Sequence, residues 1–209
     1  MRFKEGIMKI EIDYKLVWSC ILFVLINKFD IYFIFLISII IHECIHLIFG
    51  KIINGKVNYL RLGIFGMSMN MAFLGKQNLI KKILFFLSGP ISNYVIAYSF
   101  KDINLTITYV NYALFFFNLL PILPLDGGNI VLEVLKRIIG KSKAYYFLLK
   151  FTKCILFFIT FGYAIVLIKI KNIFILGVLI YLWYLYFIEE ARYTLFKRTI
   201  KCMKNIEKI

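Results

Sequence analysis

The segment His42-Glu43-Cys44-Ile45-His46 lies inside an apolar run from Ile31 to Phe49 and holds the only two histidines of the chain. Side chains four residues apart lie on one face of a helix, so both imidazoles can bind one zinc ion. Glu43 would then lie beside an open coordination position and act as a general base. Ionisable groups inside an apolar run are costly, which favours this reading over the alternative of a structural His–Glu cluster.

A third zinc ligand must be an oxygen or a thiolate, because the chain has no other histidine. Pro121 and Pro124 end a second apolar run and cannot continue a regular helix. Broken backbone at membrane depth is tolerated where it lines a cavity. Asp126 follows this break and is the best-placed carboxylate, and two histidines, a carboxylate and water form a known catalytic set. The alternative is that Asp126 caps a helix over 127–139.

The composition indicates an integral membrane protein, because 62% of the 209 residues are hydrophobic and soluble proteins are nearer 45–50% apolar. We predict an all-α polytopic fold in a single domain over 1–209, with no PDZ or CBS domain. Partial alternation over 56–73 predicts a small strand region on the membrane surface, with an amphipathic loop as the alternative. The six predicted spans are 14–26, 31–49, 79–100, 105–123, 145–168 and 173–188.

We attribute the net charge of +15 to membrane topology rather than to binding of nucleic acid. Of the 26 Lys and Arg residues, 22 lie in the N-terminal head, in 51–82, in 125–153 and after residue 191, and the rest lie in three short turns. The positive-inside rule then places both termini in the cytoplasm. The histidines would lie in the cytoplasmic half of the second span. The tail over 192–209 is predicted to be an amphipathic helix on anionic lipid.

Span 79–100 contains Ser88-Gly89-Pro90-Ile91-Ser92-Asn93. Gly and Pro allow a kink and a close helix approach in a membrane. Asn93 can hydrogen-bond a neighbouring helix, and packing is its default role.

Three motifs occur in this order along the chain: His42-Glu43-x-x-His46, Gly89-Pro90-x-x-Asn93 and Asn118-x-x-Pro121-x-x-Pro124-x-Asp126-Gly127-Gly128. Together they resemble the site-2 protease family of intramembrane zinc metalloproteases, M50. The resemblance covers about residues 10–190 and implies that His42, His46 and Asp126 bind zinc and that Glu43 is the general base. It also implies a role for Asn118 in the active-site region, and we assign Asn93 as a second supporting residue.

Within this family the chain looks most like the stage IV sporulation protein FB type. That resemblance implies processing of the membrane-associated sigma factor K precursor in sporulation. It also implies inhibitory partners of the stage IV sporulation FA and bypass-of-forespore A type. Ile45 departs from the usual glycine before the second histidine. The expected absence of a CBS domain puts nucleotide regulation in doubt.

Two other functions compete with the protease. A catalytically silent relative would bind membrane partners, although the proposed ligands and base are all present. A metal permease would also place His and Asp inside a membrane, but it often has an internal repeat, which this sequence lacks. The cleavage site and the oligomeric state do not follow from the sequence.

Overall fold

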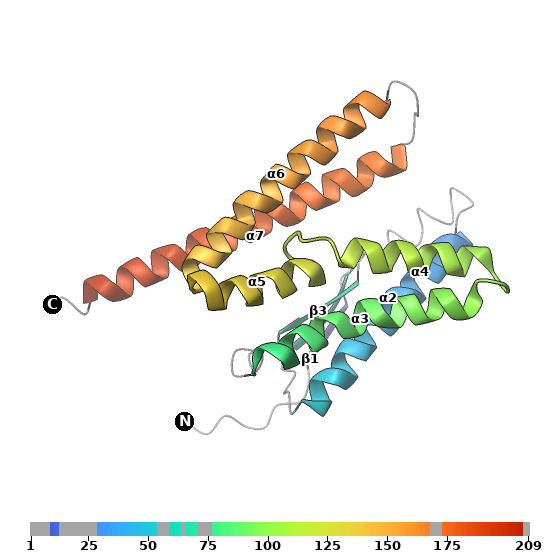
Figure 1. The fold of residues 1–209 in the computed structure, drawn as a ribbon, viewed down its shortest axis with the longest axis horizontal. Coiled ribbons are helices and arrows are strands. Elements are labelled where there is room, and N and C mark those ends of the chain that lie inside the picture. The colour runs from blue at the N-terminus through green and yellow to red at the C-terminus, as the bar shows by residue number, and fades with distance from the viewer. Residues whose placement is uncertain are drawn as a thin grey trace. The chain divides into compact units, whose positions relative to one another are not determined.

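The structure is a computed structural model that describes residues 9–12, 29–53, 59–63, 66–70, 77–167 and 173–206. It contains three strands and six helices in these residues (Figure 1). The predicted first span, 14–26, lies outside the described residues. The chain divides into two compact units, Met1–Leu119 and Leu120–Ile209, and each is described by itself.

The first unit contains the three helices α2 (Phe29–Ile52), α3 (Leu79–Phe100) and α4 (Leu105–Asn118). α3 packs against both α2 and α4, and α2 also touches α4. Each of α3 and α4 begins at an asparagine whose side chain accepts a backbone N–H: Asn78 accepts from Lys81 at 2.9 Å and Asn104 from Ile107 at 3.1 Å. These caps fix where the two helices start and therefore which residues face α2.

The strand region predicted over 56–73 is confirmed as a hairpin. β2 (Tyr59–Gly63) and β3 (Gly66–Asn70) pair antiparallel, with Gly63 opposite Gly66. β1 (Lys9–Ile12) adds a parallel strand to β2, so the order of the sheet is β1-β2-β3. The N-terminal head carries no signal that predicts this third strand, because a four-residue strand is decided by its partner.

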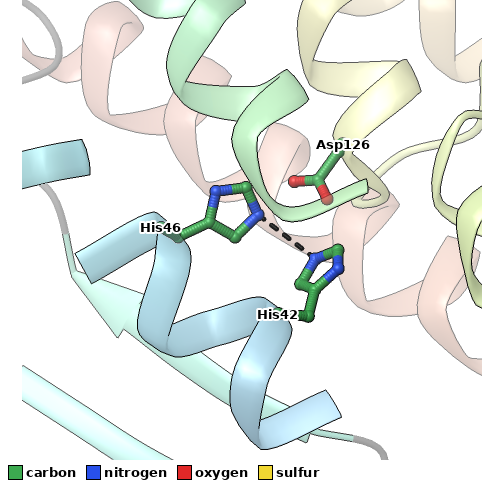
Figure 2. A group of neighbouring side chains, drawn as sticks. All are labelled: His42, His46 and Asp126. Carbon is green, nitrogen blue, oxygen red and sulfur yellow. Dashed lines mark hydrogen bonds between the residues drawn. The ribbon is translucent and has the colours of Figure 1, made fainter. Parts of the chain in front are cut away.

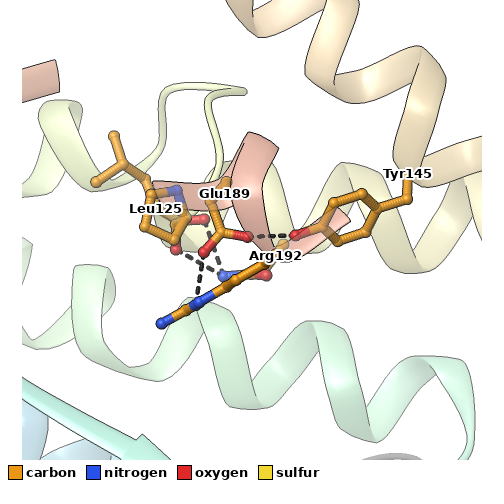
Figure 3. A network of polar contacts seen from close by, with 6 residues as sticks. Leu125, Tyr145, Glu189 and Arg192 are labelled. Carbon is orange, nitrogen blue, oxygen red and sulfur yellow. Dashed lines mark hydrogen bonds and ion pairs between the residues drawn. The ribbon is translucent and has the colours of Figure 1, made fainter. Parts of the chain in front are cut away.

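The second unit contains α5 (Asp126–Ile139), α6 (Lys141–Leu167) and α7 (Ile173–Ile206). α5 packs on α6, and α6 packs on α7. Gly140, with φ 81°, separates α5 from α6 in a left-handed conformation that favours glycine. Glu189 is buried on α7, where it accepts hydrogen bonds from the Tyr145 hydroxyl and from Arg192 (Figure 3). This network ties α6 to α7.

Several predicted boundaries are corrected. The predicted span 105–123 ends as a helix at Asn118, because Pro121 and Pro124 follow. The helix predicted from residue 145 begins at Lys141, and the last helix continues to Ile206 rather than ending at residue 188. Span six and the first part of the predicted surface tail are therefore one helix.

Membrane character is carried by three of the described helices. Phe29–Ile52, Leu79–Phe100 and the segment Lys141–Ile165 are long and apolar enough to cross a bilayer. Many of their large apolar side chains are exposed, as a lipid-facing surface requires. The number of crossings remains a prediction.

Candidate metal centre

The two histidines lie one turn apart on α2 and are both buried, at 4% and 3% exposed. Their rings lie edge to face, with centroids 4.8 Å apart. The Nε2 atoms of His42 and His46 lie 3.2 Å from each other. The helical spacing therefore brings one nitrogen of each ring to a common point, as the sequence predicts.

The other ring nitrogens are held by α3. His42 Nδ1 lies 2.7 Å from Asn93 Oδ1, and His46 Nδ1 lies 2.8 Å from the carbonyl oxygen of Phe85. The Ser88 hydroxyl is also 3.1 Å from His46 Nδ1. Because carbonyl oxygens only accept, these partners assign the proton to each Nδ1. Each Nε2 is then the unprotonated ring nitrogen, which is the one that can bind a metal ion.

The spacing of the nitrogens fits zinc. Zn–N bonds of about 2.0–2.1 Å at a tetrahedral angle place two nitrogens roughly 3.3 Å apart. The observed separation between His42 Nε2 and His46 Nε2 is 3.2 Å. Nδ1–H donation to a carbonyl is also the usual outer contact of a zinc-bound histidine. The residues present therefore fit this metal.

Gly89 gives the two nitrogens their space. A Cβ at this position would lie 2.3 Å from His46 Nε2 and 2.5 Å from His42 Nε2. Real Cβ atoms do not come this close, so only glycine permits α3 to pass beside the histidine pair. Pro90, the next residue, is fully buried. The Gly-Pro pair therefore allows α3 to lie close to α2, which is one of the two roles predicted for this pair.

Asp126, the predicted third ligand, belongs to the second unit. Figure 2 draws Asp126 with the two histidines, and the three residues are of the kinds that could hold a metal ion. Asp126 is the first residue of α5, and the N-cap position is Leu125. Asp126 is therefore not the capping residue that the alternative required. Two histidines and a carboxylate are the protein ligands of several hydrolytic zinc sites.

The remaining predicted residues take different positions. Glu43 is half-buried on α2 and follows His42 directly, about 100° around the helix. Asn93 is fully buried and its Oδ1 lies 2.7 Å from His42 Nδ1, a contact that suits the supporting role assigned to it as well as the packing role. Asn118 ends α4, and its amide donates to the Leu114 carbonyl at 3.0 Å. This contact lies within its own helix and does not reach the histidines.

Sequence reasoning missed three groups at this site. They are the Phe85 carbonyl, the Ser88 hydroxyl and the Asn111 amide, which lies behind Asn93. Every residue has a backbone carbonyl, so the sequence does not show which one will face a histidine. Asn111 could have been identified from the sequence, because a polar side chain within an apolar helix usually forms a hydrogen bond with a neighbouring helix.

Comparison with known proteins gives two findings. Residues 87–161 match the family model described as Peptidase family M50. The site-2 protease from Methanocaldococcus jannaschii has a similar structure, with a TM-score of 0.62 and 21% identity over 91% of this chain and 93% of that chain. No curated protein matches the chain.

These findings define a class. The six helices and the small sheet have a fold similar to that of a site-2 protease. The family match includes Gly89, Asn93 and Asp126. The two histidines lie outside the matched residues, so their arrangement is independent support.

Proposed function

We propose that this protein is an intramembrane zinc metalloprotease that cleaves a membrane-associated protein in regulated intramembrane proteolysis. The observation that carries the proposal is the buried histidine pair. Its Nε2 atoms converge at 3.2 Å, and α3 holds both Nδ1 atoms. Such an arrangement inside an apolar helix is costly unless a cation is bound there.

His42, His46 and Asp126 would hold the zinc ion. When bound, zinc supplies Lewis acidity, which polarises a carbonyl oxygen and makes water a nucleophile at neutral pH. Asn93 and the Phe85 carbonyl keep the imidazoles in the tautomer that binds metal. Gly89 keeps side-chain atoms out of the position between the nitrogens.

Glu43 would move the protons. Its carboxylate takes a proton from the attacking water as the water oxygen bonds to the scissile carbonyl carbon. It then returns that proton to the amine as the C–N bond breaks. General acid–base catalysis of this kind contributes about 10²–10⁴-fold to a rate. Asn118 remains a candidate supporting residue of the active-site region.

The substrate class follows from the setting. A site within apolar helices meets a peptide bond only in a membrane-associated segment. Six crossings with both termini in the cytoplasm would open the site to cytosolic water, which hydrolysis consumes. Strands β1 and β3 are the edges of the sheet, and an extended substrate segment could pair with such an edge.

As a finer proposal, the substrate is the membrane-associated sigma factor K precursor of sporulating bacteria. Partners of the stage IV sporulation FA and bypass-of-forespore A type would then inhibit the enzyme. Only the motif resemblance supports this part. Co-expression with candidate membrane-tethered transcription-factor precursors, read as a size shift on a gel, tests it.

The decisive experiment separates metal binding from proton transfer. Purified protein in detergent is assayed for zinc by plasma mass spectrometry and for cleavage of a membrane-tethered substrate. We expect about one zinc per chain, lost in His46→Ala and Asp126→Ala. Glu43→Gln should keep zinc and lose about 100-fold or more in cleavage rate.

Three results would contradict the proposal. A Glu43→Gln protein that cleaves at the wild-type rate removes the assigned base. A wild-type protein that carries zinc into reconstituted vesicles but cleaves no candidate is a permease. If zinc is bound and neither cleavage nor transport occurs, the chain is a silent relative.

A further inference from the structure

A chain of buried amides extends from the histidine pair to α4. Asn93 Nδ2 donates to Asn111 Oδ1 at 3.1 Å, and Asn111 Nδ2 donates to the Ser38 hydroxyl at 3.0 Å. Asn93 and Asn111 are both 0% exposed, and Ser38 is 4% exposed. The chain therefore links α3, α4 and α2 at the level of His42.

The direction of this chain is fixed at its far end. Asn111 Nδ2 also donates to the Ile107 carbonyl, 2.9 Å away on α4. A backbone carbonyl can only accept, so the NH₂ group of Asn111 must face it and Oδ1 must face Asn93. The Ile107 carbonyl therefore fixes the orientation of the Asn111 amide, because a backbone carbonyl cannot become a donor.

The orientation then passes from residue to residue. Since Asn111 presents an oxygen, Asn93 must present its NH₂ group to it. Asn93 Oδ1 is thereby directed at His42 Nδ1, 2.7 Å away. His42 must carry its proton on Nδ1, so its Nε2 offers a lone pair to the metal position.

We infer that Asn111 is a positioning residue of the metal centre, which acts through Asn93 to fix the metal-binding tautomer of His42. Asn111 touches neither a proposed ligand nor the metal position in any contact described above. The inference rests on the proposed function, because it assumes that His42 binds zinc.

The test exploits the symmetry of a carboxylate. In Asn111→Ala, the Asn93 amide loses the partner that orients it, so zinc affinity should fall by about 10–100-fold. Adding Asn93→Asp should restore it, because both oxygens of the introduced carboxylate accept from His42 Nδ1–H in either orientation. In Asn93→Asp alone, a carboxylate oxygen meets Asn111 Oδ1 and affinity should also fall. The double variant should bind zinc more tightly than either single variant.

Thr108→Ala is the matched control. Thr108 is a buried polar residue one turn before Asn111 on α4, and its hydroxyl donates to the Asn104 carbonyl of the same segment. This variant should keep wild-type zinc affinity. If Asn111→Ala does not fold, Asn111→Ser replaces it, because a hydroxyl can still donate to the Ile107 carbonyl but cannot reach as far as an amide.

Zinc affinity is measured by competition with a chromophoric chelator on purified protein in detergent. The absorption spectrum of the cobalt-substituted protein reports the ligand set. Wild-type affinity in Asn111→Ala, or no recovery in the double variant, overturns the role of Asn111 and leaves the proposed function intact. A wild-type protein that binds no zinc overturns the proposed function and this inference together.

Discussion

Two polar clusters form around buried side chains of the helices, and they are built differently. The histidine cluster consists of His42, His46, Asn93, Asn111 and Ser38. The glutamate cluster consists of Glu189, Tyr145 and Arg192. In the glutamate cluster a carboxylate receives two donors, so charge and hydrogen bonds balance within the cluster.

The histidine cluster is arranged around two ring nitrogens instead of a carboxylate. Its donors and acceptors alternate from the Ile107 carbonyl to His42, and they leave two acceptor nitrogens 3.2 Å apart. A metal ion can bind to two nitrogens at this separation. The comparison teaches that burial of polar groups does not by itself mark a site. A site is marked by acceptors that converge on one point.

The largest expected effect comes from filling that point. Gly89→Ala places a methyl group 2.3 Å from His46 Nε2. We expect zinc affinity to fall by at least about 100-fold, beyond the usual effect of losing an outer contact. Equilibrium dialysis with zinc measures it.

Gly162→Ala is its control, because a Cβ there meets nothing within 4 Å. Alanine in a helix interior gains up to about 1 kcal/mol over glycine, so this variant should bind zinc normally and unfold no earlier. Normal zinc binding by Gly89→Ala would mean that the histidine pair is structural, like the glutamate cluster.

Removal of the metal should have the next largest effect, in this case on the stability of the folded protein. Zinc at about 100–1,000 times its Kd stabilises a folded protein by roughly 2.7–4.1 kcal/mol. We expect a chelator to lower the melting temperature of wild-type protein in detergent and to leave that of His46→Ala unchanged. An equal shift in both proteins would place the metal elsewhere.

A substitution in the glutamate cluster should lower the stability of the protein and leave zinc binding unchanged. In Arg192→Gln the Glu189 side chain, which is 6% exposed, loses its ion pair. We expect a loss of about 1–3 kcal/mol in unfolding free energy, with zinc affinity unchanged. Thermal unfolding and zinc binding are measured on the same samples.

Lys197→Gln on the same helix changes the charge equally at an exposed position and should have little effect. A fall in zinc affinity in Arg192→Gln would show that the two clusters are coupled, which would end the contrast between them.

Asn118→Ala should have the smallest effect. It removes one hydrogen bond to the Leu114 carbonyl, worth about 0.5–1.5 kcal/mol, and should leave zinc bound. Cleavage assays of the same variant sharpen the assignment. A loss of more than about tenfold in cleavage with zinc retained would give Asn118 a role toward the substrate.

Local rules made much of this protein predictable. A four-residue spacing on a helix places His42 and His46 on one face wherever that helix lies. Pro121 and Pro124 must end a helix, and the sequence placed that end five residues too late only because apolar residues continue to Leu123. The hairpin over β2 and β3 followed from alternation and its glycines.

Interactions between helices could not be predicted from the sequence. The sequence did not predict that Gly89 faces the two Nε2 atoms or that the Phe85 carbonyl holds His46. Nor did it predict the parallel pairing of β1 with β2. Each of these depends on which elements are neighbours and in what register, and apolar membrane helices look alike to one another in sequence.

The sequence by itself determined the chemistry: two imidazoles one turn apart, a carboxylate between them, and a second carboxylate after a broken helix. Residue types and helical spacing suffice for that. Only the tertiary structure decided which nitrogen of each imidazole points to the metal position. That choice is made by acceptors on α3, and behind them by Asn111 on α4. Hydrogen bonds between helices exist only once the helices have packed.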